Sequence, residues 1–237
     1  MTRIDAFLIH GIGKITDPHY YDDFVIGIRK NLPIDIDINF HPVDYSRLLE
    51  PKEDIIFSWF NNRFWKKLHN FACYYICDVL AYAYTRGVPG PGDFIYDLTE
   101  LLKTKFRAVD EKYPDSKKIV IGHSLGSIVG FGYTWEEKID CLITMGSPFD
   151  YFSIRYAGFG RDNPDLPFFY NFWKDHDAVA TEISKNPNFK RVKDIQVSSW
   201  NPKYLAPLRA HSVYWTSDFV HKEIAKIVEG LSLAVDD

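Results

Sequence analysis

The sequence predicts an α/β protein built on a mostly parallel sheet. Two observations predict this class. Short apolar runs of strand character alternate along the chain with longer stretches in which apolar residues recur every three or four positions. Most of the short runs are followed directly by glycine, histidine, serine or aspartate, and the carboxyl ends of parallel strands are where such sheets place their ligands.

The composition fits a single folded domain, which we expect to span residues 1–237. A hydrophobic fraction of 46% and an aromatic fraction of 16% exclude a disordered chain. The formal net charge is −4, with no basic run, so nucleic acid is not expected as the main partner. Cys73, Cys77 and Cys141 are too few for a disulfide framework, which favours a reducing compartment and a cytoplasmic location.

The apolar stretches are too short to predict a signal peptide or a transmembrane segment. The run in "MTRIDAFLIHG" is shorter than a signal h-region, and no small-residue cleavage site follows it. The longest apolar stretch, from Phe71 to Tyr84, contains Asp78 and falls short of the ~20 residues that a membrane span needs. Peripheral contact with a membrane stays compatible with the sequence.

The first elements are a strand, a helix and a second strand. A strand is expected at 4–9, where it runs into the turn "HGIG". In "YYDDFVIGIRKNL" the side chains of Phe24, Ile28 and Leu32 share one helical stripe. The segment 34–40 then alternates isoleucine and phenylalanine with polar residues, which is typical of a strand.

The middle of the chain predicts two helices separated by a break. Helical periodicity runs from Asn61 to Tyr84, "PGPG" interrupts it, and a second helical pattern covers 94–109. We expect 51–92 to form a small helical cap inserted into the domain. His69, Cys73 and Cys77 share one stripe of the first helix, but no fourth ligand accompanies them, so we expect no metal.

The second half continues the alternation. A strand and a helix meet in "KKIVIGHSLGSIVGFGY", and apolar segments follow at 139–149, 166–173 and 194–200. The last helix is expected in "SDFVHKEIAKIVEGL", with Ser217 or Asp218 as N-cap and His221 exposed to solvent.

The pentapeptide Gly122-His123-Ser124-Leu125-Gly126 has the form G-x-S-x-G between a strand and a helix. A nucleophilic serine must be raised above the sheet on a turn so tight that side chains two residues away would clash. Glycines at 122 and 126 remove those side chains. The Leu125 N–H begins the following helix and can donate to an oxyanion. The pattern therefore predicts Ser124 as a nucleophile.

Four segments resemble the α/β-hydrolase superfamily, on its lipase and esterase side. They are "HGIG", "GHSLG", "DHDAV" and "AHSVYW", and the resemblance extends from Ile4 to the last helix. The family usually has two antiparallel strands before the "HG" strand, which here opens the sequence. The resemblance therefore implies a shortened sheet of about six strands with helices on both faces. It also implies a second oxyanion donor, the N–H of Ile12.

The resemblance further implies an acid and a base that follow the serine in chain order. Asp177 is the preferred acid, and Asp175 and Asp150 remain alternatives after neighbouring strands. His211 is the expected base. His10 and His123 belong to the turns themselves and are expected to point elsewhere, and His176 is expected to be exposed.

These residues predict a serine hydrolase that cleaves a carboxylic ester without a metal or organic cofactor. The aromatics Phe149, Tyr151 and Phe152 suggest an apolar acyl or aryl group, so the expected partner is a small or lipid-like ester. An amidase, a thioesterase or an acyltransferase would use the same triad. The alternative is a binding protein that keeps the fold without catalysis. The motifs predict no oligomeric state.

Overall fold

The computed structural model describes residues 2–11, 19, 21–45, 48, 94–155, 166–177, 179–189, 191–198 and 210–234. The expected helix at 61–84 and the expected cap at 51–92 lie outside these residues, so the cap and the division into domains stay predictions. Within the described ranges, no helix combines the length and the apolar character that crossing a bilayer requires.

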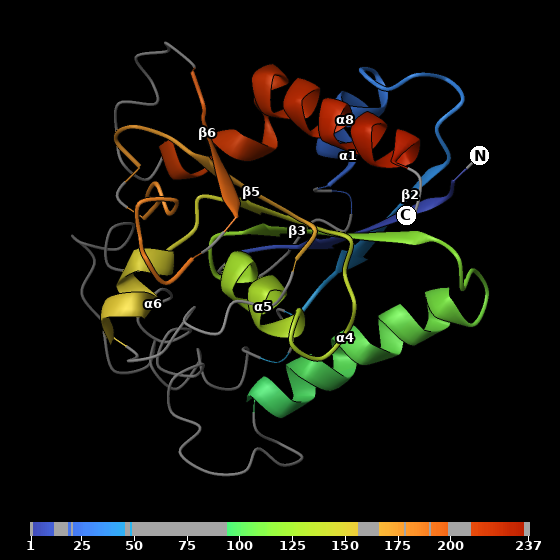
Figure 1. The fold of residues 1–237 in the computed structure, drawn as a ribbon, viewed down its shortest axis with the longest axis horizontal. Coiled ribbons are helices and arrows are strands. Elements are labelled where there is room, and N and C mark those ends of the chain that lie inside the picture. The colour runs from blue at the N-terminus through green and yellow to red at the C-terminus, as the bar shows by residue number, and fades with distance from the viewer. Residues whose placement is uncertain are drawn as a thin grey trace.

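The sheet has six strands, all parallel, in the order β2-β1-β3-β4-β5-β6 (Figure 1). This confirms the predicted sheet. The strands are β1 (Ile4–Ile9), β2 (Ile38–Val43), β3 (Lys117–His123), β4 (Cys141–Met145), β5 (Phe168–Trp173) and β6 (Val192–Gln196). Because all six run in one direction, their carboxyl ends share one edge, and the strand order reverses beside β1.

Helices cover both faces of the sheet, as predicted (Figure 1). On one face lie α1 (Asp22–Arg29) and α8 (Asp218–Leu233), which pack against each other. The other face carries α4 (Phe94–Asp110) and α5 (Leu125–Tyr133), and α6 (Phe149–Arg155) follows β4 on that side. A short 3-10 helix, η3 (Val213–Trp215), precedes α8.

The first strand shows why the sheet is so apolar. All six residues of β1 are buried. Phe7 and Ile9 belong to the core cluster under α4 and α5, whereas Ala6 and Leu8 belong to the cluster under α1 and α8. A parallel strand with helices on both sides buries odd and even positions alike, which is why five of its six residues are apolar. The exception is Asp5, whose buried carboxylate accepts hydrogen bonds from Arg3 and His41.

Two predicted strand boundaries needed correction, and one helix was not predicted. The second strand begins at Ile38, not at 34, and Ile34 is fully exposed in the turns that precede it. Pro42 lies inside β2, which tolerates it because β2 is an edge strand. The strand expected within 194–200 begins earlier, at Val192. Helix α6 was not predicted from the sequence.

The aromatics after Ser147 also differ from expectation. Phe149 and Phe152 are buried in the core, and the Phe149 ring packs edge-on against Phe131, Phe169 and Phe189. These two side chains therefore belong to the protein interior.

The last helix begins as predicted but buries its histidine. Ser217 is the N-cap of α8, although its side chain makes no capping hydrogen bond. His221 is buried, contrary to the prediction, and its Nε2–H donates to the Trp215 carbonyl over 2.9 Å. A Cβ at Gly27 of α1 would collide with the His221 ring. The close contact of α1 with α8 therefore turns an expected surface position into an interior one.

The two ends of the described chain meet at one lysine. The Lys117 N–H donates to the Arg3 carbonyl over 2.9 Å, and Lys117 Nζ donates to the Ala234 carbonyl over 2.6 Å. Lys117 and Arg3 stand at the beginnings of β3 and β1. Both ends therefore lie at the amino-terminal edge of the sheet (Figure 1).

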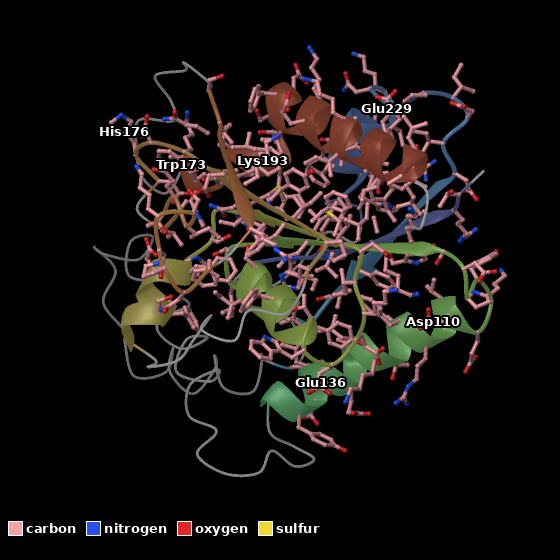
Figure 2. The ribbon with its side chains drawn as sticks, in the orientation of Figure 1. Asp110, Glu136, Trp173, His176, Lys193 and Glu229 are labelled. Atoms are coloured by element: carbon pink, nitrogen blue, oxygen red, sulfur yellow. The ribbon has the colours of Figure 1, made fainter. Side chains whose placement is uncertain are left out.

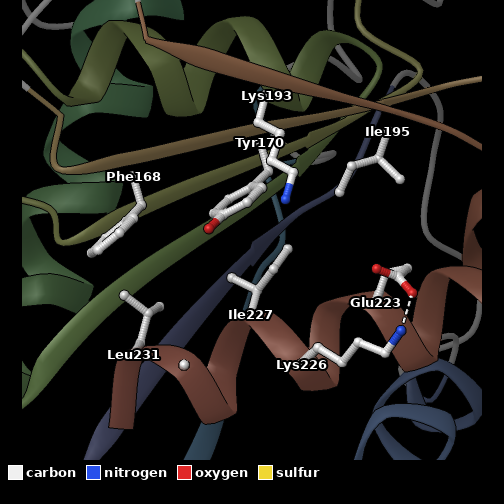
Figure 3. Close-up of a pocket in the computed structure, with 9 residues that line it drawn as sticks. Phe168, Tyr170, Lys193, Ile195, Glu223, Lys226, Ile227 and Leu231 are labelled. Atoms are coloured by element: carbon white, nitrogen blue, oxygen red, sulfur yellow. Dashed lines mark hydrogen bonds and ion pairs between the residues drawn. The ribbon is translucent and has the colours of Figure 1, made fainter. Parts of the chain in front are cut away.

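Two cavities lined by described residues lie away from the predicted site. One, of about 290 Å³, lies between β5, β6 and α8, with Tyr170, Lys193 and Ile227 among its lining (Figure 3). The other, of about 540 Å³, lies between β2 and α4 and includes Arg3 and Lys112. Neither lining contains a residue that the sequence predicts to be catalytic.

Candidate active site

Ser124 occupies a strained turn at the carboxyl edge of the sheet. It stands between the last residue of β3 and the first residue of α5, with φ 55° and ψ −123°. A non-glycine residue in such a region costs on the order of 1–3 kcal/mol and persists only where its surroundings enforce it. Here the Ser124 N–H donates to the Met145 carbonyl over 2.9 Å, which ties the turn to the end of β4.

The two glycines of the pentapeptide allow backbone segments to touch. A Cβ at Gly122 would lie 2.5 Å from the Gly126 carbonyl oxygen, and a Cβ at Gly126 would collide with the His10 carbonyl oxygen. The obstacle in each case is backbone, which cannot swing aside as a side chain can. Gly122 therefore allows the turn to fold tightly on itself, and Gly126 allows it to pack directly on the end of β1.

The turn after β1 lies against the serine. A Cβ at Gly11 would stand 2.7 Å from the Ser124 Cβ. Tyr45 holds this turn, since its hydroxyl is 3.0 Å from the carbonyl oxygens of both His10 and Gly11. The His10 Nδ1–H donates to the Gly11 carbonyl over 2.6 Å, and His10 Nε2 accepts from the Tyr45 N–H over 3.3 Å. Ile12, the expected second oxyanion donor, lies outside the described residues.

Leu125 supplies the first backbone N–H of α5. The first N–H groups of a helix have no acceptor within the helix, and they carry the positive end of its dipole. Negative charge that develops beside Ser124 is therefore favoured at this position.

His211 and Asp177 form a buried pair. His211 Nδ1 lies 3.1 Å from Asp177 Oδ1 and 3.0 Å from Oδ2. Burial disfavours the charged carboxylate, but hydrogen bonds from His211, Tyr214 and the Val179 N–H outweigh burial and hold the pKa of Asp177 below its ordinary value. An ionised carboxylate only accepts hydrogen bonds, so Nδ1 of His211 carries the proton and Nε2 is its basic nitrogen.

The two alternative acids bind other partners. Asp150 accepts a hydrogen bond from Asn186 Nδ2 over 2.8 Å, and Asp175 accepts one from Gln196 Nε2 over 2.7 Å. Of the three candidate acids, the structure brings Asp177 to His211. His176 is exposed, as expected, at the turn after β5 (Figure 2).

His123 joins the base to the strained turn. It precedes Ser124, and its ring centroid lies 4.8 Å from that of His211. The His123 Nε2–H donates to the His211 backbone carbonyl over 2.8 Å. Gly146 follows Met145, whose carbonyl accepts from the Ser124 N–H. A Cβ at Gly146 would stand 3.0 Å from His211 Cε1. His123 and Gly146, which both lie next to the Ser124 turn, thus contact His211, and this brings the serine and the base close together.

The expectation that His123 points away from the site was wrong. Its side chain is buried at the carboxyl end of β3, among His211, Tyr214 and Trp215. Burial, together with the nearby charge of His211, lowers the pKa of His123 to about 3. His123 is therefore neutral at physiological pH and serves as a hydrogen-bond donor.

Tyr214 contacts the acid, and sequence reasoning missed it. Its hydroxyl donates to Asp177 Oδ2 over 2.7 Å. The only signal in the sequence was spacing, because Tyr214 follows His211 by three residues and such residues share one face of a helical turn.

Two other kinds of chemistry find little support among the described residues. Cys141 is fully buried, and burial raises the pKa of its thiol, which disfavours the reactive thiolate. Over the described ranges, no group of three or more histidine, cysteine, aspartate or glutamate side chains is placed to hold a metal ion. His69, Cys73 and Cys77 lie outside these ranges.

Comparisons by sequence found one short match. No family model matches the chain. Among curated proteins, a monoacylglycerol lipase from Saccharomyces cerevisiae is 29% identical over 92 residues. The match covers 35% of this chain and spans only 20% of the length of that relative.

Comparisons of structure extend over nearly the whole chain. A soluble variant of monoglyceride lipase from Saccharomyces cerevisiae superposes with a TM-score of 0.53 and 10% identity, over 97% of this chain and 87% of the other. An α/β serine hydrolase without a lid from Xanthomonas campestris superposes with a TM-score of 0.51 and 11% identity, over 100% of this chain and 86% of the other. An esterase domain from Rhodothermus marinus superposes with a TM-score of 0.50 and 11% identity, over 97% of this chain and 85% of the other. With such low identities, the likeness concerns the fold.

Proposed function

We propose, from the premise that this chain has the α/β-hydrolase fold, that it is a serine hydrolase with Ser124 as nucleophile, His211 as base and Asp177 as acid. One observation carries the proposal most directly. A serine held at φ 55° beside a buried histidine–carboxylate pair is a costly arrangement that packing alone does not require. The same arrangement is what nucleophilic catalysis by serine needs.

The first half of the proposed reaction forms an acyl-enzyme. Ser124 Oγ attacks the carbonyl carbon of an ester while Nε2 of His211 takes the hydroxyl proton. The resulting imidazolium is stabilised by the Asp177 carboxylate, which accepts from Nδ1. The tetrahedral intermediate then collapses, and the alcohol leaves with the proton that His211 had taken.

Two backbone N–H groups would hold the oxyanion in this reaction. Leu125 provides one at the start of α5. Ile12 is the proposed second donor, which rests on the "HGIG" motif and on the position of Gly11 against Ser124. Loss of a single donor of this kind typically costs ~10²–10³ in kcat.

In the second half, water attacks the acyl-enzyme. His211 takes a proton from the water and returns it to Ser124 Oγ as the carboxylic acid leaves. The reaction balances with these residues and water alone, so the proposal includes no metal or organic cofactor.

We propose a carboxylic ester as the substrate bond, with an apolar acyl or aryl group. Since Phe149 and Phe152 belong to the core, this preference now rests on the likeness to a monoacylglycerol lipase. A monoacylglycerol is therefore the first natural substrate to test, followed by amide and thioester analogues of the same acyl chain.

Labelling with a fluorophosphonate probe, read by intact-mass spectrometry, tests the nucleophile without knowledge of the substrate. We expect one adduct on the wild type and none on Ser124→Ala. Ser147→Ala is the matched control, because Ser147 is also buried at a strand end and its hydroxyl has no partner within the described part of the chain. This variant should label like the wild type.

An adduct that persists on Ser124→Ala would place the reactive group elsewhere and overturn the proposal. A folded wild type that reacts with neither a fluorophosphonate nor a smaller organophosphate would favour a binding protein without catalysis. With the adduct established, Ser124→Ala and His211→Ala should each lower kcat for ester hydrolysis by several powers of ten.

A further inference from the structure

Tyr214 presents an unexplained contact inside the proposed site. Its side chain is fully buried in η3, and its hydroxyl donates to Asp177 Oδ2 over 2.7 Å. His211 Nδ1 lies 3.0 Å from that same oxygen. The base and the tyrosine therefore approach the acid from the same short segment of chain.

We propose that Tyr214 is a positioning residue that fixes the Asp177 carboxylate in the orientation in which it holds His211. This inference rests on the proposed function, because it assigns Tyr214 to the same reaction. Tyr214 acts through Asp177 and touches neither the nucleophile nor the substrate in this assignment.

The hydrogen bonds around Asp177 explain why the tyrosine is needed. Oδ1 accepts from the Val179 N–H over 2.9 Å, and Oδ2 accepts from the Tyr214 hydroxyl over 2.7 Å. Among the described residues, each carboxylate oxygen thus has one donor besides His211. Two donors on opposite oxygens prevent the carboxylate from turning about its Cβ–Cγ bond, so both oxygens stay directed at Nδ1.

The hydroxyl also takes up part of the carboxylate charge. Burial, reinforced by the charge of Asp177, raises the pKa of Tyr214 well above its ordinary value, so it remains a donor throughout the working pH range. The other titratable groups near this pair are His123, which is neutral, and His10 beyond it, while Lys174 meets the Tyr214 hydroxyl through its backbone. Without the tyrosine hydroxyl, more negative charge would be directed at His211, which would then keep its proton to higher pH.

Tyr214→Phe removes the hydroxyl and keeps the packing of the ring. A Cβ at Gly146 would lie 2.9 Å from Tyr214 Cε2, and the His123 ring centroid is 5.8 Å away. A phenyl ring fills the same space against both. The matched control is Tyr133→Phe, because Tyr133 is buried and its hydroxyl has no hydrogen-bond partner among the residues described.

The experiment is the rate of fluorophosphonate labelling of Ser124 as a function of pH, for the wild type and both variants. In this reaction Ser124 Oγ displaces fluoride from phosphorus and the proton passes to His211, so the rate falls when His211 is protonated. For Tyr214→Phe we expect labelling roughly tenfold slower at neutral pH, because Asp177 would hold His211 in position less firmly. We also expect the acid-side inflection to move upward by about 0.5 pH unit.

Tyr133→Phe should match the wild type in rate and inflection. A Tyr214→Phe profile identical to the wild type would overturn the inference, as would a rate loss without a shift, which indicates packing alone. Wild-type protein that does not label at any pH would instead refute the proposed function itself, so the two failures are distinct.

A second variant covers the case in which Tyr214→Phe does not fold, as judged by near-ultraviolet circular dichroism. Incorporation of 3,5-difluorotyrosine at position 214 keeps the ring and the hydroxyl but makes that hydroxyl more acidic and a stronger donor. The inflection should then move to lower pH. An inflection that stays in place would contradict the role of the hydroxyl.

Discussion

At the scale of single residues, His123 shows how a neighbour of the nucleophile can act without touching substrate. Its Nε2–H holds the backbone carbonyl of His211, whose side chain is held by Asp177. The base is thus restrained at both its main chain and its ring. Because the pKa of His123 is lowered to about 3, mainly by burial, no second imidazolium competes with the one that forms on His211.

We therefore predict that His123→Phe lowers ester hydrolysis about tenfold, because the donor to the His211 carbonyl is lost. His123→Gln, whose amide nitrogen can occupy the place of Nε2, should recover much of the activity. Steady-state kinetics on a soluble aryl ester measures both. The control is His176→Gln, an exposed histidine on the turn after β5, which should be unchanged. Equal activity of the phenylalanine variant and the wild type would contradict this role.

The sequence went far in selecting residues of the site but not their supporting contacts. The glycine spacing selected Ser124, and the resemblance together with chain order selected Asp177 and His211; the structure brings Asp177 to His211, while their catalytic roles stay predictions. Asp150 and Asp175 remained open because only the fold decides which carboxylate meets the imidazole. Tyr214 and His123 were missed or misjudged because a buried hydrogen bond depends on packing between distant segments, which no local pattern records.

At the scale of elements, the turn between β3 and α5 depends on glycine for backbone contact. A Cβ at Gly126 would collide with the carbonyl oxygens of Ile9 and His10 at the end of β1. We predict that Gly126→Ala destabilises the protein by about 1–3 kcal/mol, because backbone must move to relieve the clash. Urea unfolding at pH 7 measures the change, and labelling of Ser124 should fall with it.

Gly230→Ala is the matched control for this prediction. Gly230 lies in α8, and a Cβ there meets no atom within 4 Å. Alanine in a helix interior should instead stabilise the protein by about 0.5–1 kcal/mol. Unfolding of both alanine variants at the same urea concentration as the wild type would contradict the prediction that the Gly126 turn packs tightly against β1.

Strands were predictable where both of their faces are buried, and helices where the apolar periodicity extends over many residues. The central strands read clearly because they are almost entirely buried and mostly apolar, and α4 because its apolar residues recur at helical spacing over 17 residues. The edge was harder, since alternation at 34–37 mimics a strand while β2 begins at Ile38. Helix α6 was hidden because it begins immediately after a Gly-Ser-Pro turn and is short.

At the scale of the whole molecule, acid stability should depend on a buried carboxylate far from the site. The Asp5 side chain is fully buried and accepts from Arg3 over 2.9 and 3.0 Å and from His41 over 2.7 Å. Burial disfavours its charge, but the hydrogen bonds from Arg3 and His41 outweigh burial and lower the pKa of Asp5 below its ordinary value. Its stabilising contribution is therefore present above about pH 4 and is lost as the pH falls through the lowered value.

Asp5→Asn should consequently be less stable than the wild type at pH 7, by about 1–3 kcal/mol. The difference in stability should shrink toward pH 3, because the Asp5 carboxylate of the wild type becomes protonated there and its stabilising contribution is lost. Urea unfolding at the two pH values tests this. Asp37→Asn is the control, since Asp37 is half exposed and its nearest Arg3 nitrogen is 3.8 Å away. A gap for Asp5→Asn that stays constant with pH would contradict the prediction.

The contacts of Lys117 with Arg3 and Ala234 have a practical consequence for handling the protein. Arg3 and Ala234 lie at the amino-terminal edge of the sheet, and Ser124 lies at the opposite edge. A surface linker or a fused partner joined beside either of these residues would attach at the edge of the sheet opposite to the one that carries Ser124. Immobilised preparations attached in this way should label at Ser124 as fast as the protein in solution, whichever of the two residues carries the linker.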